Sequence, residues 1–209
     1  MAGVSLLASA DISEAIADLV ARVKPSVVQI RVHGRGVGAG VVWDAGGAIV
    51  TNHHVVGDVG GPVEVRLGDG RRLPARLVRR WRAADLALLQ VPAGGLQPAS
   101  AGDSAGLRVG QLVLAIGHPW GQPDVVTAGI ISGLGEAKSP WNGRTVDYIR
   151  SDVRLAPGNS GGPLIDAAGR VVGINSMIWG GDMAVAIPAG VVQRWLARGR
   201  SPFGAAEAA

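Results

Sequence analysis

A serine surrounded by small residues stands in the second half of the chain, in the segment Gly158-Asn159-Ser160-Gly161-Gly162-Pro163. Small neighbours leave the hydroxyl exposed and allow backbone N–H groups to turn toward a substrate oxygen. The same Gly-x-Ser-x-Gly pattern occurs in α/β-hydrolases, in which the catalytic histidine follows the serine in the chain. All four histidines of this chain precede Ser160, so we exclude the α/β-hydrolase alternative.

Two segments of the first half can complete a Ser-His-Asp triad. The segment Thr51-Asn52-His53-His54-Val55-Val56 follows one apolar run, and Asp85 opens another. A serine hydroxyl is a weak nucleophile near neutral pH and needs an imidazole to accept its proton, while a carboxylate orients that imidazole. The order histidine, aspartate, serine would bring the three groups together in a cleft between two lobes.

The segments TNHHVV, AADLALLQV and APGNSGGPLID resemble the HtrA/Deg branch of the trypsin-like serine proteases, with weaker similarity in VTAGIISGLG, RVVGINS and AVAIP. The resemblance covers residues 25–196. It implies that Ser160 is the nucleophile, that His54 is the general base and that Asp85 is the carboxylate that orients it. It also implies a chymotrypsin-like double barrel.

The resemblance further implies an oxyanion hole and a primary substrate pocket. Backbone N–H groups of Gly158, Asn159 and Ser160 are the candidates for the oxyanion hole. The residues expected near the pocket are Leu155, Ser176, Met177 and Ile178. Arg154 precedes Leu155, where trypsin-like cleavage after Lys or Arg would need an acid, so we expect small to medium aliphatic residues before the cleaved bond. An alternative role for Ser176 is a hydrogen bond that supports Asp85.

Adjacent His53 and His54 compete for the role of base. The family pattern places the base directly before Val55-Val56, which favours His54, and adjacent side chains on an extended chain face opposite ways. A histidine pair also suggests a metal, but the chain lacks HExxH and a nearby carboxylate at ligand spacing. We therefore expect no metal and no cofactor. His118 is expected to be a loop residue rather than a second base.

Apolar periodicity predicts the elements that position these residues. A helical stripe predicts a helix over residues 11–23, begun by a capping box of Asp11 and Glu14, and another stripe predicts a closing helix over 188–198. Between them the period changes to two. The predicted strands after the first helix are 26–32, 36–43, 48–51, 62–67, 72–78, 86–91, 109–116, 125–132, 144–151, 162–165, 171–175 and 183–187. Two antiparallel sets of about six strands predict an all-β fold of two packed barrels with short N- and C-terminal helices.

The length of 209 residues allows one domain or two small lobes. We expect an N-terminal segment and helix in 1–24, a first barrel with His54 and Asp85 in 25–103, a second barrel with Ser160 and the closing helix in 104–200, and a tail in 201–209. The loop 133–147 is expected to be either a mobile activation element or an ordinary barrel loop. HtrA/Deg proteins often carry C-terminal PDZ domains, whereas we expect a protease domain alone here.

The composition of the chain limits which kinds of functional site and which binding partners are expected. The chain has no cysteine, which excludes disulfides, thiolate nucleophiles and Cys-based metal sites. Lys and Arg number 20 against 16 Asp and Glu, and arginines concentrate in 66–82. Alternation of Val63, Val65 and Leu67 with polar residues favours the outward face of strands over a nucleic-acid patch, so we expect no nucleic-acid partner. No apolar run approaches the about 18 residues that span a bilayer, so we expect no integral membrane segment.

The function expected from these observations is a serine endopeptidase that cleaves unfolded or misfolded proteins through an acyl-enzyme. The alternative is a peptide-binding or chaperone-like module of the protease fold with low or regulated activity. Polypeptide substrates are the expected partners in both cases. The sequence leaves open a homotrimer or a monomer, and it leaves open an exported, periplasmic or a cytoplasmic location.

Overall fold

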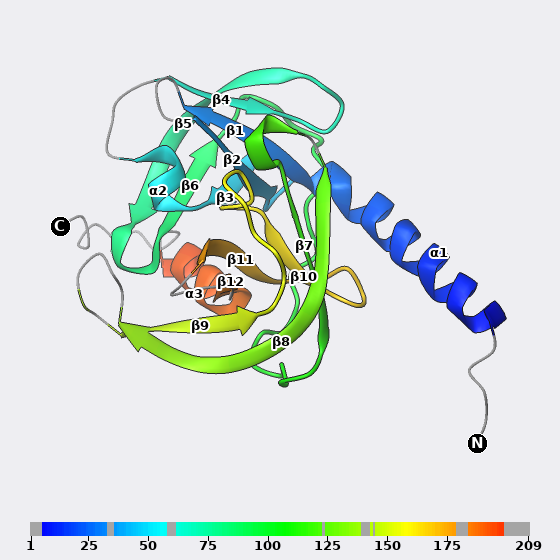
Figure 1. Ribbon diagram of the computed structural model, residues 1–209. Helices are drawn as coiled ribbons and strands as arrows, with labels where there is room; N and C mark the ends of the chain where they lie inside the picture. The colour runs from blue at the N-terminus through cyan, green and yellow to red at the C-terminus, as the bar shows by residue number, and fades with distance from the viewer. Residues whose placement is uncertain are drawn as a thin grey trace.

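The computed structural model describes residues 6–32, 36–57, 62–122, 124–138, 143, 145–178 and 184–198. Two closed antiparallel β-barrels pack against each other, and one long helix, α1, extends away from them (Figure 1). The predicted all-β architecture of two barrels with helices near both ends is confirmed. The predicted tail 201–209 lies outside the described residues.

The first barrel has the strand order β1-β2-β3-β6-β5-β4. Its strands are β1 Val27–Val32, β2 Gly36–Val42, β3 Ala48–Thr51, β4 Val63–Arg66, β5 Arg72–Trp81 and β6 Leu86–Gln90. The second barrel has the order β10-β11-β12-β9-β8-β7. Its strands are β7 Leu112–Gly117, β8 Val125–Lys138, β9 Thr145–Ser151, β10 Pro163–Asp166, β11 Val171–Ile178 and β12 Ala184–Pro188. Both barrels therefore arise from consecutive stretches of chain.

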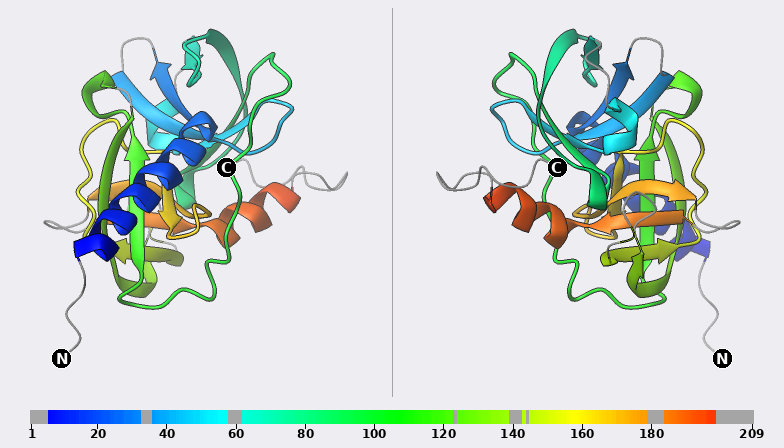
Figure 2. Two further views of the ribbon diagram at one scale, coloured as in Figure 1. Left: turned by 90° about the vertical axis from the view of Figure 1, so that its right-hand side faces the viewer. Right: turned by 90° about the vertical axis from the view of Figure 1, so that its left-hand side faces the viewer.

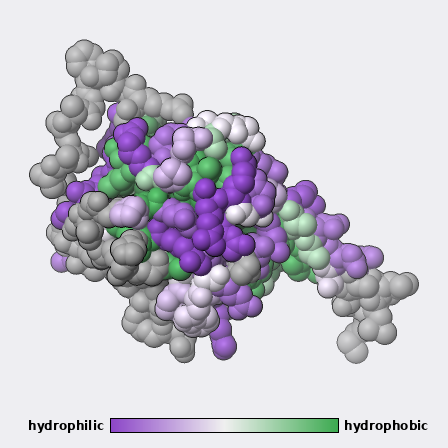
Figure 3. Space-filling view, turned by 90° about the horizontal axis from the view of Figure 1, so that it is seen from above, coloured by the Kyte–Doolittle hydropathy of each residue, from purple (hydrophilic) through white to green (hydrophobic). Residues whose placement is uncertain are grey.

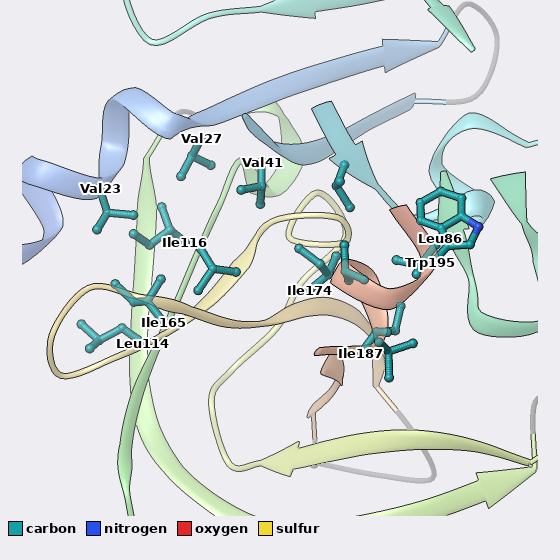
Figure 4. Close-up of a cluster of buried hydrophobic side chains, with 14 of the residues drawn as sticks. Val23, Val27, Val41, Leu86, Leu114, Ile116, Ile165, Ile174, Ile187 and Trp195 are labelled. Atoms are coloured by element: carbon teal, nitrogen blue, oxygen red, sulfur yellow. The ribbon is translucent and has the colours of Figure 1, made fainter. Parts of the chain in front are cut away.

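Three clusters of buried apolar side chains form the hydrophobic core of the molecule. One, around Ile30 and Leu89, fills the first barrel, and another, around Ile131 and Leu164, fills the second. The third cluster lies between the barrels, and its members come from both (Figure 4). The members labelled there are Val23, Val27, Val41, Leu86, Leu114, Ile116, Ile165, Ile174, Ile187 and Trp195. This shared cluster sets how the two barrels are placed relative to each other.

The helix α1 spans Leu6–Val23, so it begins before the predicted start at Asp11. Leucine and alanine are strong helix formers, and they precede Asp11 in the sequence, so no cap is needed there. Only the C-terminal part packs on the body, where Leu19 and Val23 are buried. Toward the N-terminus of the helix, Ile12 is 59% exposed. The helix projects from the side of the barrels in Figure 1 and crosses in front of them in the left view of Figure 2.

The segment 133–147 is mostly paired strand, not the loop that the sequence suggested. Strand β8 continues to Lys138, and β9 begins at Thr145, so the two form a long hairpin. A β-bulge between Ile131 and Gly133 shifts the register and lets pairing continue past the predicted end of the strand. Residues 139–142 and 144 of this segment lie outside the described residues.

The closing helix α3, Ala189–Arg198, connects the end of the second barrel to the first. Trp195 on this helix is 6% exposed. The Arg79 guanidinium on β5 lies 4.4 Å from the centre of the Trp195 ring and donates a hydrogen bond to the Trp195 carbonyl. A cation over an indole face is a favourable contact, so this pair fastens α3 to the first barrel.

Strand β5 has alternating exposed and half-buried residues along its whole length. The exposed positions include Arg72, Arg76 and Arg80, and Arg72 forms an ion pair of 3.8 Å with Glu64. Hydrophilic side chains gather over the middle of the face seen from above (Figure 3). The alternation is that of a strand with one face toward a barrel core and one toward solvent.

Candidate active site

Asp85 is held firmly at the start of β6. Its backbone is left-handed, with φ of 54° and ψ of 42°, a conformation that aspartate adopts more readily than most residues. Its carbonyl accepts hydrogen bonds from the N–H of His53 at 3.1 Å and from Nδ2 of Asn52 at 3.0 Å. The residue is 5% exposed. Its carboxylate therefore has a fixed position beside α2, His53–Val56.

The Asp85 carboxylate accepts three hydrogen bonds. Its Oδ2 lies 2.7 Å from Nδ1 of His54 and 2.6 Å from the Oγ of Ser176, which donates to it. Its Oδ1 accepts the backbone N–H of His54 at 2.9 Å. Because an ionised carboxylate can only accept, Nδ1 of His54 carries the proton and Nε2 keeps a free lone pair. This is the tautomer that a general base requires.

The hydroxyl of Ser160 donates a 2.7 Å hydrogen bond to the backbone carbonyl of Ser176. A hydroxyl has one proton, so this proton is not donated to His54 at the same time. Ser176 therefore contacts both halves of the site, Asp85 through its side chain and Ser160 through its carbonyl. The O–H bond of Ser160 has to turn away from the Ser176 carbonyl before His54 can accept the proton.

Gly158 holds the backbone before Ser160 in a shape that other residues cannot adopt. Its φ is 111°, and a Cβ there would lie 2.4 Å from the His118 carbonyl oxygen and 2.7 Å from the Pro119 Cα. The preceding Pro157 carbonyl accepts the N–H of Trp120 at 2.9 Å. In a trans peptide the C=O and N–H point opposite ways, so the Gly158 N–H points away from Trp120.

The three N–H groups predicted for the oxyanion hole differ in their partners. The N–H of Asn159 donates to the Ala156 carbonyl at 2.9 Å. Over the described part of the chain, the N–H groups of Gly158 and Ser160 have no hydrogen-bond partner. Two free donors on either side of Asn159 can bind a developing negative charge on oxygen.

The segment that begins at Ser160 is bound to the first barrel. The N–H of Ala39 on β2 donates to the Ser160 carbonyl at 2.8 Å, and the Thr51 hydroxyl donates to the Ala39 carbonyl at 2.7 Å. A Cβ on Gly161 would lie 2.1 Å from that carbonyl oxygen and 2.2 Å from Thr51 Oγ1. Only glycine fits there, because the two barrels approach each other so closely.

A profile described as a trypsin-like peptidase domain matches residues 38–174, a range that includes His54, Asp85 and Ser160. The chain belongs to the trypsin-like peptidases. This assignment agrees with the double barrel and with the hydrogen-bonded histidine and aspartate described above.

Curated relatives of this trypsin-like chain carry serine protease names. A probable periplasmic serine endoprotease DegP-like of Pseudomonas fulva (strain 12-X) is 44% identical over 162 residues, which cover 75% of this chain and 33% of that protein. Protease Do-like 1, chloroplastic, of Arabidopsis thaliana is 43% identical over 149 residues, which cover 69% of this chain and 34% of that protein. The chain thus spans 33% and 34% of the lengths of these two relatives.

Solved structures of HtrA-type proteases have the same fold. The HtrA-type protease AlgW with tripeptide matches with a TM-score of 0.79 and 35% identity, over 87% of this chain and 62% of that one. Deg5 matches with a TM-score of 0.78 and 36% identity, over 87% of this chain and 92% of that one. The resemblance to the HtrA/Deg branch and the chymotrypsin-like double barrel are confirmed.

The residues expected near the substrate pocket lie in different settings. Leu155 is 9% exposed and belongs to the apolar core of the second barrel. Met177 and Ile178 are on β11, where their backbones pair with Val185 and Ala184, and their side chains lie outside the described part of the structure. Ser176 has the alternative contact that the sequence suggested, the hydrogen bond to Asp85.

The histidine pair lies on a helical turn, not on the extended chain that the sequence suggested. Successive residues on a helix differ in direction by about 100°, which still separates the two side chains. His54 faces the Asp85 carboxylate, whereas His53 is 4% exposed and its backbone N–H donates to the Asp85 carbonyl. The geometry therefore favours His54 as the base.

His118 has a larger part in the site than the loop role that the sequence suggested. It is 4% exposed, its N–H donates to the Gly158 carbonyl at 3.1 Å, and its Nδ1 accepts the N–H of Asp124 at 3.2 Å. Burial lowers the pKa of His118; Asp124 opposes this effect and Arg66 adds to it. The neutral imidazole of His118 thus supports the loop that is hydrogen-bonded to Gly158.

The sequence did not predict the residues that support the site through hydrogen bonds. These are Ala39, Thr51, Asn52 and the loop from His118 to Gln122. Asn52 and Thr51 stand in the TNHHVV segment, so their closeness to His54 was the one available signal. Their partners, the Asp85 and Ala39 carbonyls, are backbone groups that no sequence pattern marks.

The described residues contain no group of three or more His, Cys, Asp or Glu side chains placed to hold a metal ion. Over the same residues, no helix is both long enough and apolar enough to cross a membrane.

Proposed function

We propose that this chain is a serine endopeptidase in which Ser160 is the nucleophile, His54 the general base and Asp85 the orienting carboxylate. One observation carries the proposal: the 2.7 Å contact between His54 Nδ1 and Asp85 Oδ2, on a carboxylate that is also bound by Ser176. The trypsin-like family assignment supports the same roles.

In the proposed reaction the Ser160 Oγ attacks the carbonyl carbon of the scissile peptide bond, and its proton passes to His54 Nε2. The oxyanion that forms accepts hydrogen bonds from the N–H groups of Gly158 and Ser160, a contribution that in other enzymes is about 2.7–4 kcal/mol per donor. His54 then protonates the leaving amine, the C–N bond breaks and an ester on Ser160 remains. Water attacks the carbonyl carbon of this ester and gives its proton to His54. The C–O bond to Ser160 then breaks, His54 returns the proton to Ser160 Oγ, and the carboxylic acid product leaves.

We propose unfolded or misfolded polypeptides as substrates. An extended peptide can add to a free strand edge through main-chain hydrogen bonds, whereas a folded protein has few such groups available. Ser176, Met177 and Ile178 at the end of β11, together with Leu155, are the proposed contacts for the residues before the cleaved bond. The apolar character of Leu155, Met177 and Ile178 favours small to medium aliphatic residues, and Arg154 disfavours lysine or arginine.

Labelling with a fluorophosphonate and cleavage of casein test the proposal. Wild type is expected to be labelled on Ser160 and to cleave casein, and Ser160→Ala is expected to do neither while retaining its circular dichroism spectrum. Absence of both labelling and cleavage in folded wild type would contradict the assignment.

A second candidate, a peptide-binding or chaperone-like module with low basal activity, is favoured by one contact. The Ser160 proton is donated to the Ser176 carbonyl rather than to His54. If this contact dominates in solution, labelling will be slow, and both wild type and Ser160→Ala will bind unfolded casein equally well. Fast labelling and multiple turnovers would instead support the endopeptidase.

A further inference from the structure

Trp120 combines high exposure with an uncommon backbone conformation. It is 77% exposed, more than any other large apolar side chain among the residues that the structure describes. Its φ of 51° and ψ of 24° are left-handed, which is unfavourable for a bulky residue. Such conformations persist only where the surrounding structure imposes them, and they concentrate at functional sites.

Four hydrogen bonds impose this conformation. The Trp120 N–H donates to the Pro157 carbonyl at 2.9 Å, and the next two N–H groups, of Gly121 and Gln122, donate to the His118 and Pro119 carbonyls at 3.0 and 2.9 Å. Nε2 of the buried Gln29 donates to the Gly121 carbonyl at 3.0 Å. These hydrogen bonds fix the backbone of Trp120, which is bonded to the carbonyl of Pro157, the residue before Gly158.

The loop also lies against the first barrel. A Cβ on Gly121 would lie 4.0 Å from Val37 Cγ2 on β2, and the same strand binds the Ser160 carbonyl through Ala39. If the residues before the cleaved bond lie along Ser176–Ile178, those after it must leave on the other side of Ser160. β2 binds the Ser160 carbonyl, and the loop that carries Trp120 binds the Pro157 and Gly158 carbonyls, so both lie beside Ser160 where these residues can contact them.

We propose that Trp120 binds a large apolar or aromatic side chain of the substrate on the C-terminal side of the cleaved bond. This proposal rests on the proposed endopeptidase function. An indole offers a broad apolar face, and its rigid backbone reduces the ordering needed on binding. Arg31 adds selectivity: its Nη2 lies 3.9 Å from the Cβ position of Gly121, so its charge disfavours a lysine or arginine at the same place.

Internally quenched peptides test this preference. All share one sequence before the cleaved bond, and the second residue after it is phenylalanine, leucine, alanine or lysine. Wild type is expected to have a kcat/KM about 3- to 10-fold higher for phenylalanine than for alanine, the size of an aromatic contact. Trp120→Ala is expected to bring this ratio close to one, and Trp120→Phe to retain most of it. Val109→Ala is the matched control, because Val109 is 62% exposed and lies before β7, at the end away from this loop.

The outcomes separate this proposal from the endopeptidase assignment. If wild type is neither labelled by fluorophosphonate nor active on any peptide, the endopeptidase assignment fails. If wild type is labelled and active but shows no preference for phenylalanine, or Trp120→Ala keeps that preference, the role of Trp120 is overturned. A change of oligomeric state in Trp120→Ala with an unchanged ratio would place the indole at a subunit contact and would also overturn it.

Discussion

The Asp85 carboxylate receives two of its three hydrogen bonds from His54 and the third from Ser176. The last of these donors comes from the second barrel, 91 residues farther along the chain. Ser176 thus helps to orient the carboxylate, and its carbonyl accepts the hydrogen bond from the Ser160 hydroxyl. The sequence suggested two roles for this residue, a wall of the substrate pocket or support for Asp85.

Ser176→Ala distinguishes these roles, because it removes the Oγ and keeps the carbonyl. A hydrogen bond to a charged group contributes about 1.5–3 kcal/mol, so loss of support for Asp85 should lower kcat roughly 10- to 100-fold with little change in KM. Steady-state kinetics on one peptide measures both constants. Ser132→Ala, an exposed serine on β8, is the control. A raised KM with an unchanged kcat would instead assign Ser176 to the pocket.

At the scale of elements, the short turn η3, Pro119–Gly121, and the preceding His118 support the segment that carries Ser160. The N–H groups of His118 and Trp120 donate to the carbonyls of Gly158 and Pro157, which lie in the two peptides that flank the Gly158 Cα. The turn is held in place partly by the neutral His118 ring, whose Nδ1 accepts the Asp124 N–H.

His118 should make stability depend on pH. Burial lowers the pKa of His118 in the folded chain, so below about pH 6.5 the unfolded chain binds a proton that the folded chain does not. The free energy of unfolding should therefore fall as the pH drops from 7 toward 5.5. His118→Asn keeps an acceptor for the Asp124 N–H and cannot be protonated, so its stability should fall less over this range.

Urea unfolding of wild type and His118→Asn at several pH values measures this difference. The two curves should run parallel above pH 7.5, where both side chains are neutral, and should separate below pH 6.5, near the ordinary pKa of histidine of about 6.5. Curves that remain parallel down to pH 5.5 would show that His118 is not buried as a neutral ring.

For the whole molecule, the relative placement of the two barrels determines whether the site exists. His54 and Asp85 come from the first barrel, and Ser160 and Ser176 from the second. The apolar cluster between the barrels and the Arg79–Trp195 contact therefore act on the site from a distance. Figure 4 shows that Trp195 lies at one end of this cluster.

Arg79→Met tests the contact between α3 and the first barrel, because methionine keeps an apolar stem and loses the cation. We expect the free energy of unfolding to fall by about 1–2 kcal/mol, as for a partly desolvated cation over an indole. Arg76→Met, at an exposed position on the same strand, should change it by less than about 0.5 kcal/mol. Equal effects of both substitutions in thermal or urea unfolding would refute a specific role for Arg79.

Local patterns were enough to predict most of the strands and the order of the site residues. A short apolar run that follows two glycines predicted β3 at its observed bounds, and most of the other strand ends fell within a few residues. The pattern was weakest where backbone pairing, not side-chain burial, extends a strand. The glycine-rich end of β8 has few large apolar residues, so its hairpin with β9 was not apparent.

The sequence by itself singled out candidate residues, since a serine among glycines, a histidine pair and an aspartate before an apolar run are local features. It also indicated two consecutive barrels, because the periodicity of each strand is local. Contacts between distant segments had to come from the folded chain: the choice of His54 over His53 by Asp85, the double contact of Ser176, and the left-handed Trp120 beside Pro157. These contacts depend on how two packed barrels meet, and no local spacing of residues encodes that geometry.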